Sequence, residues 1–164
     1  MPEINDMLMH AYDLCEDGNF HDALQLYDLV LKQEPDNVNA LIDKGVTLQN
    51  LGRLKQAVKT YDKALGINPV NLDALINKGS SLHALGNYDQ AILCYDEALK
   101  IDKKCAMALA YKGLSLGEAG NISDALKHFK KALSIDKNYD LALLSKSMAE
   151  DLLKSIKTKK SKIL

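Results

Sequence analysis

The chain has 164 residues and a formal net charge of −1, with 26% of its residues charged. This balance gives no general attraction for nucleic acid. Trp is absent and only three prolines occur, which favours helices and argues against a β-sandwich or a β-barrel. No apolar run approaches the roughly 18–20 residues that a membrane-spanning helix needs.

The chain carries no sign of export or of metal binding. Its N-terminus, MPEINDM, contains acidic residues and lacks the basic and apolar segments of a secretory signal. The cysteines Cys15, Cys94 and Cys105 are odd in number and share no metal-ligand spacing. Cys15 and Cys94 lie within helical patterns, where we expect buried, unreactive thiols. We therefore expect a protein of the reducing cytoplasm.

One segment recurs along the chain with a period of 34 residues. Residues 40–69 read ALIDKGVTLQNLGRLKQAVKTYDKALGINP, and residues 74–103 are identical to them at half of the aligned positions. Residues 108–137 continue the pattern, and an earlier copy holds the same register at Gly18, Ala23 and Tyr27. Such a period, sustained over four copies, predicts a solenoid of stacked repeats.

The apolar residues within each copy recur at helical spacing. In the copy that contains residues 40–69, Leu41, Gly45 and Leu48 lie on one helical stripe, and Ala57 and Tyr61 lie on the next. Taken in chain order, this spacing predicts helices at about 3–16, 20–33, 38–51, 54–67, 72–85, 88–101, 106–119, 122–135 and 140–158.

The ends of these helices are marked by glycine and proline. A glycine follows the first helix of every copy, because it accepts a left-handed backbone without steric cost; these glycines are Gly18, Gly52, Gly86 and Gly120. The turn after each glycine spans about three residues, so the two helices of a copy are expected to lie antiparallel. Pro35 and Pro69 end the second helices of the first two copies.

Glycine also recurs inside the first helix of copies two to four, at Gly45, Gly79 and Gly113. A glycine there costs about 1 kcal/mol relative to alanine. We expect small residues of the second helix to compensate by letting the two backbones approach; they are Ala57, Ala91, Ala125, Ala64, Ala98 and Ala132. The aromatic residues Tyr61, Tyr95 and Phe129 are predicted to fill the space toward the next copy.

The repeated residues resemble the tetratricopeptide repeat, a helix–turn–helix unit of 34 residues. The matching positions in the second copy are Leu41, Lys44, Gly45, Leu48, Gly52, Ala57, Tyr61, Ala64 and Pro69. The resemblance covers residues 1–157 as repeats at about 4–37, 38–71, 72–105 and 106–139 with a capping helix at 140–157, and we expect a basic, disordered tail at 158–164. Copy one departs at Ala11 and the final helix at Ser147, where copies two to four have glycine.

The resemblance implies an all-α fold, a right-handed superhelix (solenoid) of antiparallel helix pairs. In this family the first helices line a concave groove, and most members are binding scaffolds. Catalytic signals are not found: the histidines His10, His21, His83 and His128 share no ligand spacing, and no nucleophile triad or phosphate loop can be identified. We therefore expect no enzyme, no cofactor and no metal site.

The predicted groove residues combine apolar side chains with short amides and carboxylates. They are Leu8, Tyr12, Asn39, Ile42, Asp43, Val46, Asp73, Ile76, Asn77, Ser80, Met107, Tyr111 and Leu114. Such a surface suits an extended peptide or an amphipathic helix of a partner protein. The alternative is that Ile42, Val46 and Ile76 pack between first helices while the polar members are merely solvated.

Two known ligand modes of the family are not expected here. The clamp for C-terminal carboxylates of chaperones needs two Lys, two Asn and an Arg; the matching positions hold Leu8, Tyr12, Asp43, Asp73 and Asn77. Acidic and apolar groups would repel a carboxylate. The asparagine ladder of O-linked N-acetylglucosamine transferase would need Asn at Met9, Asp43, Asn77, Tyr111 and Ser145, and only one position matches.

The final helix carries more apolar surface than a cap needs. One stripe, made by Leu141, Leu144, Met148 and Leu152, is not required to cover the fourth copy. It predicts self-association through this helix or its docking in a groove, the alternative being a locally buried cap. The five lysines of residues 154–164 lack interleaved aromatic residues, so a solvated tail is favoured over binding to nucleic acid or anionic lipid.

The sequence thus predicts a non-catalytic protein–protein interaction scaffold. Its ligand would be a peptide or helix with apolar anchors and a neutral or basic charge, because the predicted groove is acid-leaning. Two alternatives remain at this stage. One is a repeat protein that assembles with copies of itself, and the other is a regulatory subunit of an enzyme complex.

Overall fold

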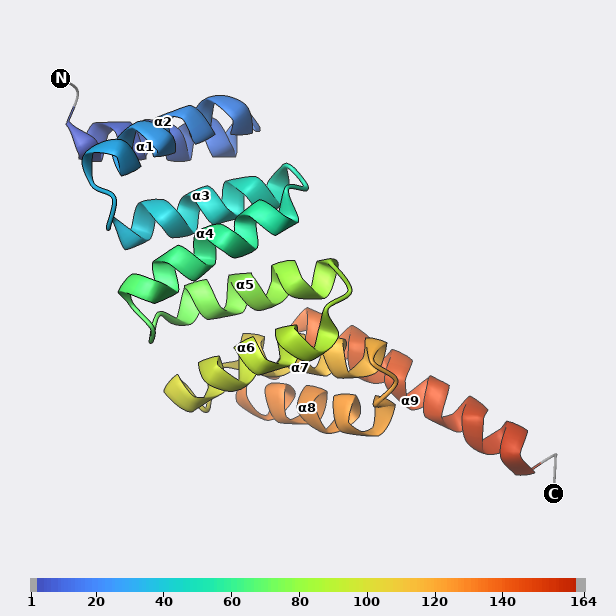
Figure 1. The fold of residues 1–164 in the computed structure, drawn as a ribbon. Coiled ribbons are helices and arrows are strands. Elements are labelled where there is room, and N and C mark those ends of the chain that lie inside the picture. The colour runs from blue at the N-terminus through green and yellow to red at the C-terminus, as the bar shows by residue number, and fades with distance from the viewer. Residues whose placement is uncertain (1–2, 162–164) are drawn as a thin grey trace. The chain divides into compact units, whose positions relative to one another are not determined.

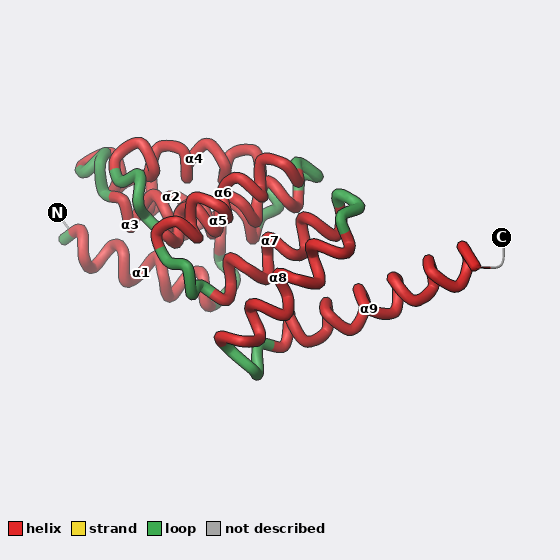
Figure 2. The backbone as a smooth tube through the Cα atoms, turned by 90° about the horizontal axis from the view of Figure 1, so that it is seen from below, coloured by secondary structure: helices red, strands yellow, loops and turns green. Residues whose placement is uncertain are grey.

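The computed structural model describes residues 3–161, with side chains through residue 158, and is helical with short loops in that range (Figure 2). The nine helices of the described range are α1 Ile4–Glu16, α2 Phe20–Gln33, α3 Val38–Asn50, α4 Leu54–Ile67, α5 Leu72–Ala84, α6 Tyr88–Ile101, α7 Ala106–Glu118, α8 Ile122–Ile135 and α9 Asp140–Ser161. The first eight begin and end within one residue of the prediction, and the all-α class is confirmed.

The last helix is longer than predicted, because α9 continues to Ser161. Lysine is a good helix former, so the lysine-rich sequence does not oppose this extension. The Thr158 hydroxyl also donates a hydrogen bond to the Lys154 carbonyl oxygen at 3.0 Å, within the last turns. Residues 158–161 therefore belong to the helix and not to a tail, while residues 162–164 lie outside the described residues.

The chain divides after Leu85 into two compact units. The N-terminal unit contains α1 to α5, in which each helix packs antiparallel on the next and α3 also contacts α5 (Figure 1). In the C-terminal unit α7 packs on α6 and on α8, and α9 packs mainly on α8 and less on α7. The boundary falls inside the third predicted repeat, since α5 lies in one unit and α6 in the other.

The predicted glycine turns are confirmed by the backbone. Gly18, Gly52, Gly86 and Gly120 have φ values between 69° and 88°, in the left-handed region that side chains disfavour. At the first of these turns the Asn19 amide donates to the Leu14 carbonyl at 2.7 Å, and Arg53 repeats this bond to Leu48 at 2.8 Å. These bonds satisfy carbonyls at the helix end, as expected for a glycine C-cap.

The first helices of three repeats begin with a side-chain cap. The Asn37 and Asn71 side-chain oxygens accept hydrogen bonds from the Ala40 and Ala74 amides, at 2.9 Å and 2.8 Å. At the start of α7 the Cys105 sulfur takes this position, 3.5 Å from the amide nitrogen of Ala108. Sequence analysis left Cys105 without a role; the structure places it as a weak substitute for an asparagine cap.

The glycines inside the first helices face an aromatic ring. A Cβ atom added to Gly45 would lie less than 3.0 Å from three ring atoms of Tyr61, and Gly113 stands in the same relation to Phe129. Tyr61 is fully buried and Phe129 is 3% exposed. The ring of the second helix therefore lies against the glycine of its own repeat, whereas the sequence predicts that it fills space toward the next copy. The six alanines predicted to let the helices approach are all buried.

An ion pair also recurs with the repeat. It joins a lysine of a first helix to an aspartate of the preceding second helix, in the pairs Lys44–Asp28 (2.5 Å), Lys78–Asp62 (2.7 Å) and Lys112–Asp96 (2.5 Å). Exposed pairs contribute at most about 1 kcal/mol each, so packing dominates. At the last junction Lys130 replaces the aspartate and lies 3.9 Å from Glu150 of α9.

The contact between Gly45 and Tyr61 predicts opposite effects for two glycine substitutions. Gly45→Ala should lower the free energy of unfolding by about 1–3 kcal/mol, because the ring must shift in a close-packed core. Gly66→Ala is the control: it lies in α4 with no atom within 4 Å of the added Cβ, so it should raise stability by about 0.5–1 kcal/mol. Urea denaturation of both variants checks this, and a Gly45→Ala variant as stable as the parent protein would contradict it.

Candidate functional site

Three of the predicted groove residues of the N-terminal unit, Tyr12, Asp43 and Val46, line a hollow of about 360 Å³ between α1, α2 and α3. Tyr12 of α1 is 60% exposed and Val46 of α3 is 36% exposed at its edge. Asp43 and Glu16 add two carboxylates, and Tyr27 forms the buried floor. The hollow therefore combines uncovered apolar surface with negative charge.

Short polar contacts line the deeper part of this hollow. The Thr47 hydroxyl donates to the Asp43 carbonyl oxygen at 2.8 Å, and its oxygen lies 3.3 Å from the Cys15 sulfur. Burial, together with the nearby Asp43 carboxylate, raises the pKa of Tyr27, so its phenol stays neutral. Cys15 is half-buried in the lining of this hollow, and within the described residues all three cysteines are free thiols.

Asp43 is a second titratable group of this hollow whose pKa is raised. Its side chain reaches solvent, but the surrounding protein removes part of its hydration and raises the pKa of the carboxyl. The ion pairs between described residues do not include Asp43, although they join several other aspartates to lysines. A carboxylate held in this way is a candidate contact for a cationic group of a ligand.

The next hollow along the N-terminal unit is closed. Gln49 of α3 fills the position that Cys15 occupies in α1, and its side-chain oxygen accepts a hydrogen bond from the Tyr61 hydroxyl. Ile76 is 5% exposed and Ile42 is half-buried against two core clusters, so both side chains pack in the interior. Sequence analysis left open whether Ile42, Val46 and Ile76 face the groove or pack between the first helices. Only Val46 lines the hollow, so Ile42 and Ile76 are not counted among its surface residues.

The remaining predicted groove residues of this unit do not line the hollow. Asn39 and Asp73 are exposed, whereas Asn77 and Ser80 are half-buried on α5. Leu8 is half-buried and packs against core residues of α1 and α2, so it contributes more to the core than to the surface.

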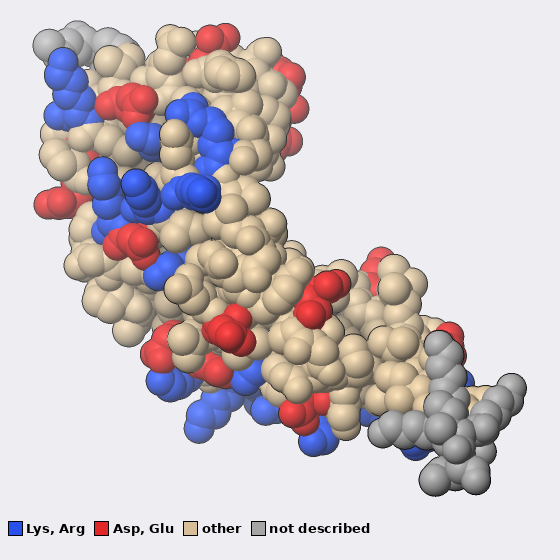
Figure 3. Space-filling view, turned by 45° about the vertical axis from the view of Figure 1, so that its right-hand side comes forward, with Lys and Arg blue, Asp and Glu red and all other residues tan. Residues whose placement is uncertain are grey.

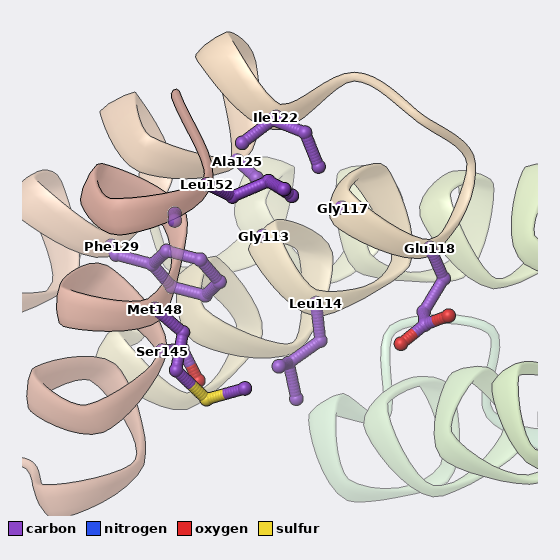
Figure 4. A pocket seen from close by; sticks show the side chains of 11 residues that line it. Gly113, Leu114, Gly117, Glu118, Ile122, Ala125, Phe129, Ser145, Met148 and Leu152 are labelled. Atoms are coloured by element: carbon purple, nitrogen blue, oxygen red, sulfur yellow. The ribbon is translucent and has the colours of Figure 1, made fainter. Parts of the chain in front are cut away.

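The C-terminal unit has a second hollow, of about 480 Å³, between α7, α8 and α9 (Figure 4). Its walls are mostly apolar, with Leu114 from α7 facing Met148 and Leu152 from α9, and with Phe129 at its floor. Glu118 supplies one carboxylate at the edge. Tyr111 stacks on Tyr95 at 6.0 Å between ring centroids and Met107 is 45% exposed, both outside the lining of this hollow.

The two hollows occupy the same place in the repeat. Cys15, Gln49 and Gly117 are separated by multiples of the 34-residue period, and so are Tyr27, Tyr61 and Phe129. Where glutamine is present, it satisfies the tyrosine hydroxyl and fills the space. In the C-terminal unit the glutamine is replaced by Gly117 and the tyrosine by Phe129, so the hydroxyl and its partner are lost together. An open apolar hollow results without an unpaired buried group.

Several lining residues were not predicted from the sequence. In the N-terminal hollow they are Cys15, Glu16, Phe20, Tyr27, Thr47 and Asn50. In the C-terminal hollow they include Gly117, Glu118, Ile122 and Phe129. The sequence does contain one indication of these hollows. The residue type changes at one equivalent position of the repeat, which is occupied by Cys15, Gln49 and Gly117.

The described residues contain no group of three or more His, Cys, Asp or Glu side chains placed to hold a metal ion. Among the described helices, none combines the length and apolar character that crossing a bilayer requires.

The raised pKa of Asp43 predicts a stability gain that depends on pH. At about pH 7 Asp43→Asn removes a charge that is less favourable in the folded than in the unfolded protein, so the free energy of unfolding should rise. The gain should shrink as the pH falls through the folded-state pKa and vanish below the ordinary value of 3.8, where both states are protonated. Thermal unfolding at about pH 7 and about pH 3 measures this.

Asp13→Asn is the matched control for this experiment, since Asp13 is exposed on α1 and lies outside the hollow lining. The interpretation fails if Asp43→Asn destabilises the protein at about pH 7, because the carboxylate would then make a favourable contact in the folded state.

Comparison with known proteins identifies the repeat. Sequence models of the tetratricopeptide repeat match residues 14–69 and residues 72–105. A barley (Hordeum vulgare) protein, the probable UDP-N-acetylglucosamine–peptide N-acetylglucosaminyltransferase SPINDLY, is 49% identical over 49 residues. That segment is 30% of this chain and 5% of the barley protein.

Solved structures share the fold over most of the chain. The crystal structure of MamA matches with a TM-score of 0.80 at 23% identity, over 90% of this chain and 81% of MamA. PilF of Pseudomonas aeruginosa matches with a TM-score of 0.83 at 20% identity, over 93% of this chain and 69% of PilF. The first repeat domain of Spaghetti (RPAP3), solved with an HSP90 peptide, matches with a TM-score of 0.68 at 19% identity, over 71% of this chain and 92% of that domain.

Helical pairs with a 34-residue register, closed by a glycine turn and a glycine–aromatic contact, agree with both kinds of comparison. The fold is that of proteins which typically mediate protein–protein interactions. The chain belongs to the tetratricopeptide-repeat family.

Proposed function

We propose that this protein is a non-catalytic interaction scaffold that binds a segment of a partner protein in the hollow between α1 and α3. The observation that carries the proposal is the combination of two exposed apolar side chains, Tyr12 and Val46, with the partly desolvated carboxylate of Asp43. Exposure of the apolar side chains to water is unfavourable, and the ion pairs between described residues do not include Asp43. A ligand with an apolar group and a cationic group would cover the apolar side chains and pair with the carboxylate.

The chemistry of the hollow favours an apolar anchor beside a basic side chain. Fully burying an aliphatic side chain contributes about 1.5–3 kcal/mol. A lysine or arginine next to that anchor would lie near Asp43 and Glu16 and would stabilise the charged form of Asp43. Asn39 and Asp73, which are exposed on α3 and α5, can bond to backbone groups of an extended segment.

The hollow of the C-terminal unit supports the same function with different selectivity. Leu114, Met148 and Leu152 offer apolar contact over the Phe129 ring, and one carboxylate, Glu118, lies among the lining residues. This hollow therefore favours an aliphatic or aromatic anchor and depends less on charge than the hollow that contains Asp43.

The proposal predicts charge-selective peptide binding. A fluorescein-labelled octapeptide of alternating Leu and Arg should bind with a dissociation constant in the micromolar range, about −8 kcal/mol, measured by fluorescence anisotropy. Asp43→Lys should weaken binding roughly tenfold by placing a like charge against the ligand. Tyr12→Ala should also weaken it, because an exposed apolar contact is lost.

The matched control is Asp13→Lys, which changes the net charge by the same amount outside the hollow. If Asp13→Lys weakens binding as much as Asp43→Lys does, the peptide responds to overall charge and the hollow is not its site. Unchanged affinity of the Asp43→Lys variant would also contradict the proposal.

Self-association through α9 is a second candidate function. Leu109 and Ala110 of α7 are 1% and 0% exposed, because helices α8 and α9 cover them. Their equivalents on α9, Leu143 and Leu144, are 45% and 64% exposed. Helix α9 thus presents a stacking face that lacks a covering helix in the described part of the chain, and its C-terminal half projects from its unit (Figure 1).

A second copy of the chain fits this face by its apolar ridge. Leu144, Met148 and Leu152 form a row with a spacing of four residues, the ridge that packs against an identical ridge. In an antiparallel pair in which the two Met148 side chains meet, Leu144 of each copy would face Leu152 of the other, which favours a symmetric dimer. Leu141 is half-buried against α7 and α8 and lies outside this face.

The dimer proposal predicts a change of mass. Replacing Leu144 and Met148 by Glu should convert a concentration-dependent dimer into a monomer in sedimentation velocity, because four carboxylates would meet at the pair. Leu93→Glu, at a 63% exposed position of α6, is the control and should leave the dimer intact. A wild-type chain that stays monomeric at all concentrations excludes this function.

The predicted alternative of a regulatory subunit of an enzyme complex stays a prediction. The barley protein is a probable transferase, but the segment similar to this chain is only 5% of that protein. This similarity covers repeat sequence in this chain, and it carries no proposal about a catalytic partner.

A further inference from the structure

The basic residues of the N-terminal unit are unevenly placed. Residues 1–85 contain twelve acidic and seven basic residues, yet four of those seven lie within eleven consecutive positions at Arg53, Lys55, Lys59 and Lys63. Figure 3 shows Lys and Arg side chains gathered on one face of the N-terminal part of the molecule. We call the four residues the α4 basic face. It is a positive surface on an otherwise acidic unit.

The cations of this face are exposed and separate from the recurring ion pairs. Lys44 and Lys78 of the same unit lie 2.5 Å and 2.7 Å from aspartates. The ion pairs between described residues include none of the four residues of the α4 basic face, and all four are exposed. Their charge is therefore available to an external anion.

The α4 basic face is not required by the repeat. The residues that match Arg53 in the other copies are Asn19, Asn87 and Asn121, and those that match Lys55 are His21, Asp89 and Ser123. Lysines four residues apart on one helix repel each other by a few tenths of a kcal/mol per pair. The lysines of the second copy thus repel one another slightly, and the repeat fold does not require them at these positions.

The face borders a hollow of about 260 Å³ between α2, α3 and α4. Leu24 and Leu48, 7% and 3% exposed, form its floor, and Gln56, Lys59 and Lys63 line its side. Asp28, which is paired with Lys44, also lines it, and Gln56 is exposed. Lys44 and Leu48 lie on the side of α3 away from Asp43 and Val46.

We propose that the α4 basic face binds an acidic, extended segment of a partner protein. Lys55, Lys59 and Lys63 follow one another at about 6 Å along the helix axis. Carboxylates on alternate residues of an extended chain are about 6.6 Å apart, so two or three can pair with this row. Arg53 lies outside this row but lines the same hollow as Lys59 and Lys63, and the Gln56 amide can bond to the segment's backbone.

The surroundings disfavour a nucleic acid as the ligand. A nucleic acid of any length would extend beyond four cations onto a unit that has five more acidic than basic residues. Aromatic side chains for base stacking do not line the hollow. A short acidic segment places its charge only where the cations are.

The test uses the full chain and a fluorescein-labelled octapeptide of alternating Glu and Ser. Anisotropy should show saturable binding that weakens steeply with salt. Lys59→Glu with Lys63→Glu should lower the affinity at least tenfold. The matched control is Lys127→Glu with Lys131→Glu, which reverses the charge of the two lysines at the equivalent repeat positions on α8.

Three outcomes would overturn this inference. One is the absence of wild-type binding at millimolar protein, about −4 kcal/mol. Another is an equal loss in the α4 and α8 variants, which would show a response to net charge alone. The third is tighter binding of a single-stranded RNA octamer than of the peptide. Because Asp43→Lys should leave this binding intact, the result is independent of the hollow between α1 and α3.

Discussion

The contact between a helix glycine and an aromatic ring is the constraint on which the rest of this structure depends. The ring of Tyr61 occupies the space that a side chain on Gly45 would need, and Phe129 does the same at Gly113. The contact brings the two helices of a repeat together and fixes the floor above which the next first helix lies. The hollow between α7, α8 and α9 is built on the Phe129 ring, and Tyr27 takes the same position beneath the hollow between α1, α2 and α3, where Ala11 stands in place of the glycine.

The residue beside the ring differs between the repeats. Gln49 fills the space and satisfies the Tyr61 hydroxyl, whereas Gly117 leaves it open above Phe129, a ring without a hydroxyl. Cys15 is short enough to leave the hollow beside Asp43 open. The scaffold is thus kept while the lining of the hollows changes, from acidic in the N-terminal unit to apolar in the C-terminal unit.

The repeat made the helices and their turns predictable, because glycine, alanine and the aromatic positions recur at one phase. Individual groove side chains were harder to predict. Helical spacing placed Ile42, Val46 and Ile76 on one surface, but only packing separates the exposed Val46 from the buried Ile76. The role of Cys105 as a cap and the closure of one hollow by Gln49 depend on contacts between helices. The α4 basic face was visible in the sequence only by comparison between copies.

The central claim is that Asp43 is held in a partly desolvated hollow for a cationic group of a partner. Carbon-13 NMR titration of the Asp43 carboxyl, with and without the Leu–Arg octapeptide, tests this most directly. The account predicts a pKa above the ordinary 3.8 in the free protein and a lower pKa in the complex, because a nearby cation stabilises the carboxylate. An Asp43 pKa that the peptide leaves unchanged would contradict it.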